Sequence, residues 1–182
     1  MRDHIHAVVG RSMGTIQAWD VVNEAISDGG EELHRNSLWW QIIGDHFIAK
    51  AFEYAHEADP DALLRYNDYG LENPAKRAKI VKLIRSLQEQ DVPVMAIGTQ
   101  AHISATSPSY EEMDRSITEM AALGLPIHMT ELDVNTAEGG QQSGSAELSD
   151  DVASGDRIDA AMQRQAEQYA NVFRCFASTK MP

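Results

Sequence analysis

The sequence predicts an α/β fold in which parallel strands are covered by helices on their outer side. Short apolar runs rich in β-forming residues alternate strictly with segments of helical periodicity along the 182 residues, and parallel neighbours need such crossover connections. Each apolar run ends in hydrogen-bonding side chains, as the strands of a barrel do. No glycine-rich phosphate loop follows any strand. These observations favour a (β/α) barrel over a doubly wound sheet.

Four βα units follow a short helix expected over residues 1–10. The strands are expected at 15–23, 62–66, 93–99 and 126–132. The helices are expected at 37–58, 74–90, 109–124 and 157–177, where apolar residues recur at three- and four-residue spacing. Asn73 before Pro74 predicts a capped helix start, and Ser109 with Glu112 has the spacing of a capping box.

Four units make only half of a closed barrel, which has eight strands and roughly 250 residues. We therefore interpret residues 1–182 as one partial (β/α)8 domain of the TIM-barrel class. A barrel opened in this way exposes two strand edges, which favour pairing. The sequence is expected to be a fragment of a longer enzyme, or to associate with itself or with a complementing chain. The polar, acidic segment 136–156 is expected to be an exposed loop.

Charge and composition exclude several classes of partner. The net charge of -13 argues against nucleic acid and anionic membranes, since both require a basic surface. No apolar run approaches the length of a membrane span, and the first residues lack the apolar core of a signal peptide. Cys175 is the only cysteine, so no internal disulfide can form, and it is interpreted as a packed apolar residue.

The residues that carry chemistry follow the predicted strands, at ends that converge on one mouth of a barrel. They are Asn23 and Glu24, Asn67 and Tyr69, Gln100 and His102, and Glu131 and Asp133. Two facing carboxylates, Glu24 and Glu131, suit glycoside cleavage, in which a protonated one donates to the leaving oxygen and an ionised one attacks the sugar. His102 could donate to Glu131, and Asp133 could fix the imidazole tautomer.

A second interpretation of this region is a metal site. Glu131, Asp133, His102 and His128 offer the oxygen and nitrogen ligands found in barrel isomerases, although they form no compact ligand motif. His128 lies within its strand and is expected to be structural.

Four motifs resemble, in order and spacing, those of glycoside hydrolase family 10, the (β/α)8 endo-β-1,4-xylanases. They are WDVVNEA at 19–25, YNDY at 66–69, GxQxH at 98–102 and TELDV at 130–134. The resemblance begins near the helix before strand four of the family and ends after helix seven. Strands one to three and strand eight have no counterpart in these residues.

The resemblance implies a role for each matching position. Glu24 would be the general acid/base and Glu131 the nucleophile of a retaining mechanism through a covalent glycosyl-enzyme. His102 and Asp133 would orient Glu131, whereas the sugar-contacting residues would be Asn23 at the 2-hydroxyl, Gln100 against the nucleophile and sugar, and Tyr69 in the leaving-group subsite.

The resemblance further implies xylan or xylo-oligosaccharides as substrate, no cofactor or metal, and a secreted, cell-surface or periplasmic enzyme. Two alternatives stay open. The partial domain could bind xylan without hydrolysing it, or a related (β/α)8 glycosidase could act on cellulose or mannan.

Overall fold

The computed structural model describes residues 1–136 and 156–179. A parallel four-stranded sheet has the order β1 (Ala18–Asn23), β2 (Leu63–Asp68), β3 (Ala96–Thr99), β5 (Ile127–Met129). A second parallel sheet pairs β4 (His102–Ser104) with β6 (Asp133–Asn135). Nearly all of the expected loop at 136–156 lies outside the described residues.

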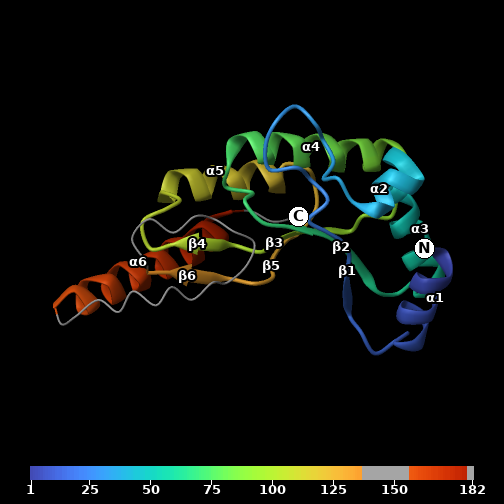
Figure 1. Ribbon diagram of the computed structural model, residues 1–182. Helices are drawn as coiled ribbons and strands as arrows, with labels where there is room; N and C mark the ends of the chain where they lie inside the picture. The colour runs from blue at the N-terminus through green and yellow to red at the C-terminus, as the bar shows by residue number, and fades with distance from the viewer. Residues whose placement is uncertain (137–155, 180–182) are drawn as a thin grey trace.

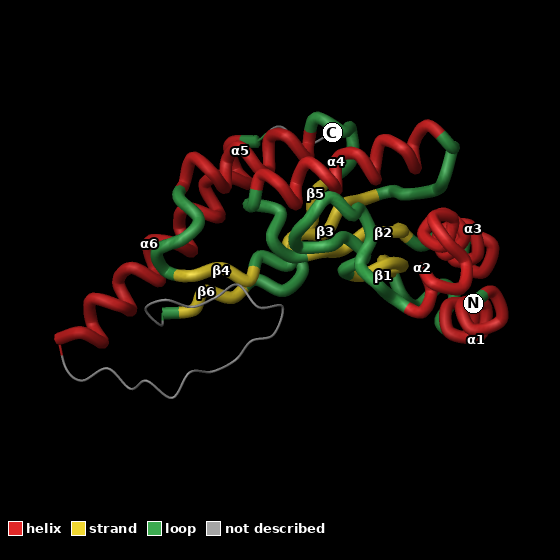
Figure 2. The backbone as a smooth tube through the Cα atoms, turned by 45° about the horizontal axis from the view of Figure 1, so that its top comes forward, coloured by secondary structure: helices red, strands yellow, loops and turns green. Residues whose placement is uncertain are grey.

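The helices alternate with the strands, as the sequence predicts. They are α1 (Arg2–Arg11), α2 (Leu38–Ile43), α3 (Phe47–Ala58), α4 (Pro74–Glu89), α5 (Tyr110–Ala121) and α6 (Asp156–Ser178), with a 3₁₀ turn η1 (Gly44–His46) between α2 and α3. Helices α4 and α5 run along one side of the sheet, α1 to α3 gather beside β1, and α6 extends along β4 and β6 (Figure 1, Figure 2). No helix in the described part of the chain is long and apolar enough to span a membrane.

The capping signals act as expected, but one predicted helix is divided. Asn73 accepts hydrogen bonds from the backbone N–H groups of Ala75 and Lys76, with proline at the first helical position. Ser109 and Glu112 form both bonds of a capping box. The helix expected at 37–58 breaks at Gly44, whose φ of 75° is open to glycine and interrupts the α-helical geometry.

Strand bounds differ from the prediction at both ends of the sheet. The first strand begins at Ala18, because Thr15 and Ile16 donate to Ser12 in a turn after α1. The strand expected at 126–132 is shorter, β5, and a further strand, β6, begins directly after the expected one; the third strand is likewise followed by a short strand, β4, that was not expected. Three-residue strands carry too little periodicity to be predicted.

A bulge in β1 aims two polar residues toward the same side of the sheet. The pairing with β2 shifts between Asp20 and Val22, so that Asp20 faces Arg65 and Asn23 faces Asn67. A bulge adds a residue to one strand and re-aims the side chains beyond it. Asn23 therefore shares a face with the polar residues of the neighbouring strands.

Two apolar clusters hold this arrangement. The larger packs the sheet against α3 and α4, with Phe52, Tyr66 and Ile80 fully buried. The smaller joins β4 and β6 to α5 and α6 through Ile103, Val134, Met113, Ile117, Val172 and Cys175. Cys175 is buried there, as expected.

Candidate active site

The carboxyl ends of the four main strands are joined directly by backbone hydrogen bonds. Glu24 N donates to Asn67 O (2.9 Å), Gln100 N to Asp68 O (3.0 Å), and Glu131 N to Gln100 O (3.2 Å). Glu24 has a φ of 55°, an uncommon conformation for a residue with a side chain. Such strain concentrates at functional sites, and here it occurs at a predicted catalytic carboxylate.

Buried carboxamides connect the two carboxylates. Gln100 Nε2 donates to Glu24 Oε1 and to Asn23 Oδ1, both at 3.1 Å. Asn67 Nδ2 donates to Asn23 Oδ1 at 2.9 Å and to Glu131 Oε1 at 3.0 Å. Gln100 and Asn67 are each only 1% exposed. The two amides therefore hold one oxygen of each carboxylate in a fixed frame.

The second oxygen of Glu131 contacts a histidine. His102 Nε2 lies 3.3 Å from Glu131 Oε2, and His102 Nδ1 lies 2.5 Å from Asp133 Oδ2. An ionised carboxylate can only accept hydrogen bonds. His102 can therefore donate to Glu131 and to Asp133 at the same time only when both of its ring nitrogens carry a hydrogen. The structure thus brings together the three residues that the sequence grouped.

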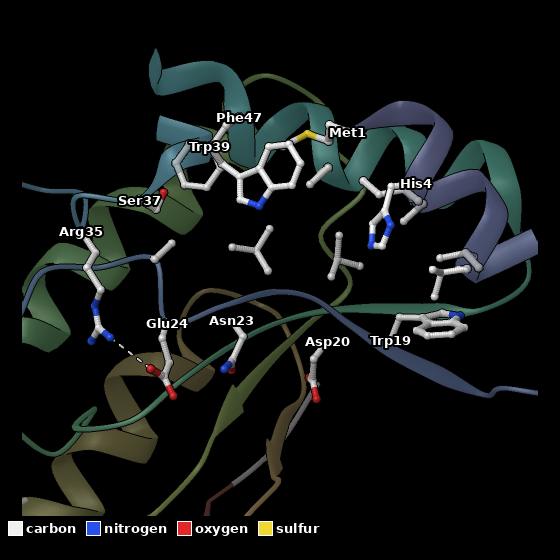
Figure 3. A pocket seen from close by; sticks show the side chains of 18 residues that line it. Met1, His4, Trp19, Asp20, Asn23, Glu24, Arg35, Ser37, Trp39 and Phe47 are labelled. Atoms are coloured by element: carbon white, nitrogen blue, oxygen red, sulfur yellow. Dashed lines mark hydrogen bonds and ion pairs between the residues drawn. The ribbon is translucent and has the colours of Figure 1, made fainter. Parts of the chain in front are cut away.

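The second oxygen of Glu24 contacts Arg35, in the segment between β1 and α2. Arg35 Nη1 donates to Glu24 Oε2 at 3.1 Å (Figure 3), and Arg35 Nη2 donates to the Tyr69 hydroxyl at 2.6 Å. Tyr69 donates in turn to Asp28 at 2.5 Å. Lys76, itself buried, lies 2.8 Å from Asp28 and 3.4 Å from the centre of the Tyr69 ring. Glu24 is therefore attached to a network of charged groups on this side.

These contacts perturb the acidity of the network. Burial raises the pKa of Asp28, but hydrogen bonds from Lys76 and Tyr69 outweigh burial and leave its pKa lowered. Burial, together with the hydrogen bond to Asp28, raises the pKa of Tyr69 to about 12. The Tyr69 hydroxyl therefore stays protonated at neutral pH and can donate.

A group of charged residues lies on the same strands, on the N-terminal side of the strand ends that carry the two carboxylates. Arg65 donates to both carboxylate oxygens of Asp20, at 2.5 and 3.0 Å, and its Nη1 lies 3.0 Å from His128 Nδ1. Burial lowers the pKa of His128, and the Arg65 charge lowers it further. The structure thus pairs His128 with a cation, which differs from the predicted grouping of His128 with Glu131, Asp133 and His102 as metal ligands.

A pocket of about 410 Å³ opens along β1. Glu24 and Arg35 lie at one end, His4 and Trp19 at the other, and Trp39 overhangs it from α2 (Figure 3). Within the described sheet β1 pairs with β2 alone. The pocket therefore follows the free edge of the first strand.

The structure adds detail to the assignment of Gln100, which was expected against Glu131 and the sugar. Its side-chain amide donates to Glu24 and Asn23, and its backbone oxygen accepts a hydrogen bond from Glu131 N. Asn67 had no assigned role, although its position at a strand end was a usable signal. Arg35, Asp28 and Lys76 were missed because no local pattern marks them.

The chain matches the model of glycosyl hydrolase family 10 over residues 1–181. It is 44% identical to an endo-1,4-beta-xylanase of Geobacillus stearothermophilus, with 97% of this chain and 51% of the relative covered. It is 38% identical to a beta-1,4-xylanase of Dictyoglomus thermophilum, with 99% and 49% covered. The chain thus spans about half the length of the curated relatives it matches.

Solved structures agree with the sequence matches. The chain superposes on the crystal structure of xylanase XynB from Paenibacillus barcinonensis complexed with a conduramine derivative, with a TM-score of 0.83 and 39% identity over 96% of this chain and 50% of that one. Xylanase 10B from Thermotoga petrophila in complex with xylobiose gives 0.79 and 40%, over 96% and 48%. The predicted (β/α)8 class, covered in part, is confirmed.

Proposed function

The chain belongs to glycosyl hydrolase family 10, and from this premise we propose that it carries the acid/base and the nucleophile of a retaining endo-1,4-β-xylanase. The observation that carries the proposal is the amide-bridged pair of carboxylates, Glu24 and Glu131, at the shared carboxyl end of the parallel strands. Paired carboxylates at this edge of a barrel suit glycoside hydrolysis.

In this mechanism Glu131 attacks the anomeric carbon while Glu24 gives its proton to the leaving oxygen. In the second step Glu24 deprotonates a water molecule, which attacks the same carbon and displaces Glu131. Asn67 and His102 hold the two oxygens of Glu131, which limits rotation of the carboxylate. Gln100 and Arg35 do the same for Glu24. Fixing both groups lowers the entropic part of the barrier.

Asn23 is suited to the sugar 2-hydroxyl. Its Oδ1 accepts from both Asn67 and Gln100, which fixes the orientation of the amide. The Asn23 amide nitrogen makes no hydrogen bond within the described residues and is the group offered to substrate. Tyr69, held beside Glu24 through Arg35, is the proposed contact on the leaving-group side.

Hydrolysis of xylo-oligosaccharides tests the proposal. The 182-residue chain is assayed alone and joined to the remaining strands of a family 10 relative. Glu131→Gln should abolish hydrolysis. Glu24→Gln should reduce it about 10²- to 10⁴-fold, but should spare the first step on an aryl xyloside whose leaving group needs no proton. Glu111→Gln, an exposed change on α5, is the matched control, and full activity of either active-site variant contradicts the proposal.

The same experiment separates the alternatives. A xylan-binding module would bind the sugar without hydrolysing it and would be insensitive to Glu131→Gln. Faster hydrolysis of cello- or manno-oligosaccharides than of xylo-oligosaccharides would mean that the substrate is cellulose or mannan rather than xylan. The xylanase names of the relatives favour xylan.

The free strand edges bear on how activity is reached. Strands β1 and β5 each have one partner in the described sheet, and we propose that further strands, from the same chain or another, pair with them. Export to the medium or the cell surface follows from a polymeric substrate. Light scattering of the purified chain tests association, and a homogeneous, active monomer would contradict the need for pairing.

A further inference from the structure

The residues that hold Glu131 belong to the small second sheet. His102 opens β4, Asp133 opens β6, and the two are direct partners in the parallel ladder. Ala101, with a φ of 59°, separates β3 from β4. The position of the His102 ring relative to Glu131 therefore depends on where the second sheet sits.

Helix α6 fixes the outer edge of that sheet. In a parallel ladder, alternate residues of a strand bond to one neighbour. Asp133 N and Asn135 O face β4, where they bond to Ala101 O and Ala105 N, so the carbonyl of Val134 faces the opposite edge. Gln165 of α6 donates to that carbonyl at 2.7 Å. The amide takes the place that a neighbouring strand would otherwise fill.

We propose that Gln165 is a positioning residue for the nucleophile. Its bond to Val134 O fixes the position of β6 relative to α6. The position of β6 in turn determines where Asp133 lies, and Asp133 holds His102 against Glu131. The apolar cluster that contains Val134, Ile103, Val172 and Cys175 holds the second sheet against α6. The Gln165 bond is directional and therefore fixes where β6 lies along the helix. The inference rests on the proposed role of Glu131.

A second glutamine of the same helix offers a matched control. Gln168 also donates to a backbone carbonyl at 2.7 Å, but its acceptor is Pro108, before α5. Loss of either bond leaves a carbonyl without its partner and should lower stability to a similar degree. The Gln165 bond is made to β6 itself, next to Asp133, whereas the Gln168 bond reaches β4 only indirectly, through Pro108 and the hydrogen bond from Ser104 N to Ser107 O.

The test is the imidazole NMR signal of His102 in the whole 182-residue chain, labelled with ¹⁵N-histidine and assigned against His102→Gln. Gln165→Met should shift or broaden the downfield Nδ1 proton of the bond to Asp133, whereas Gln168→Met should change it clearly less. The exposed change Gln163→Met should leave it unchanged. The near-isosteric Gln165→Glu, which loses the donor when ionised, serves if Gln165→Met does not fold.

An unchanged His102 signal in a folded Gln165 variant overturns the inference, and so does an equal change in Gln165→Met and Gln168→Met. The signal needs no turnover, so this outcome is independent of whether the chain hydrolyses xylan. In an active preparation, Gln165→Met should lower kcat about tenfold and leave KM within about twofold, since a displacement of about 1 Å can cost about a hundredfold in rate.

Discussion

Glu24 and Glu131 are joined through side-chain amides, and Asn67 is the amide that touches Glu131. It donates to Glu131 and to Asn23, and its oxygen accepts from the Thr130 hydroxyl at 2.8 Å. The two carboxylates are thus parts of one hydrogen-bonded unit rather than two independent groups. The residue at the centre of that unit is buried and bears no charge.

Asn67→Ala should therefore affect activity more than stability alone explains. The change leaves the Thr130 hydroxyl and one Glu131 oxygen without a partner, at a cost of about 1–3 kcal/mol in the free energy of unfolding. Hydrolysis should fall at least about tenfold, because Glu131 gains rotational freedom. Asn73→Ala removes the cap of α4, costs about 1 kcal/mol and should keep full activity. Equal activity of the two variants would show that Asn67 is only structural.

Gly98 should be intolerant of alanine because of the same amide. A methyl group at Gly98 would overlap Asn67 Oδ1 and come within 3.1 Å of Arg65 Cδ. Gly98→Ala is expected to destabilise the chain by about 1–3 kcal/mol and to lower hydrolysis by displacing Asn67. Gly10→Ala, in helix α1 with open space around it, should instead raise stability by about 0.5–1 kcal/mol. Urea unfolding of both variants checks the contrast.

The parts of the site that sequence predicts are those with a local signal. Glu24 and Glu131 each end an apolar run, and a polar residue at the end of a buried strand is visible without a structure. The alternation of runs likewise predicts the parallel sheet. The same reasoning placed His102 and Asp133 near Glu131, where the structure has them.

The parts that sequence does not predict depend on long side chains or short strands. Arg35 reaches Tyr69, 34 positions away, and Lys76 reaches Asp28, 48 positions away. No periodicity marks such contacts, because they are set by where two loops meet in space. The pairing of β4 with β6 and the side of Gln100 that faces Glu24 were unpredictable for the same reason.

Lys76 should be the most costly single charge to remove from the site. Its side chain is 3% exposed and lies 2.8 Å from Asp68, whose side chain is fully buried. Burial raises the pKa of Asp68, although Lys76 opposes that rise. Lys76→Met leaves this carboxylate uncompensated and should cost about 3–5 kcal/mol.

The double variant Lys76→Met/Asp68→Asn should recover part of that stability, because no buried charge is then unpaired. Lys50→Met, which removes an exposed partner of Glu53, should change little. Urea unfolding of the three variants provides the measurement. A loss for Lys76→Met as small as that for Lys50→Met would mean that water reaches Asp68.

Stability should decrease in mild acid through His128. Burial and the neighbouring Arg65 lower the pKa of His128 below its ordinary value of 6.5, with Asp20 opposing. The unfolded chain then binds more protons than the folded chain between the folded pKa and about 6.5, so stability rises with pH across that window. The contribution of His128 to stability is complete above about pH 6.5 and is lost as the pH falls toward the pKa of His128 in the folded chain.

Urea unfolding at about pH 7.5 and about pH 5.5 should show a smaller difference in the free energy of unfolding for His128→Gln than for the unaltered chain. His46→Gln, an exposed change in η1, should keep the original difference, and a pH dependence equally steep in His128→Gln would show that Arg65 does not hold His128 neutral.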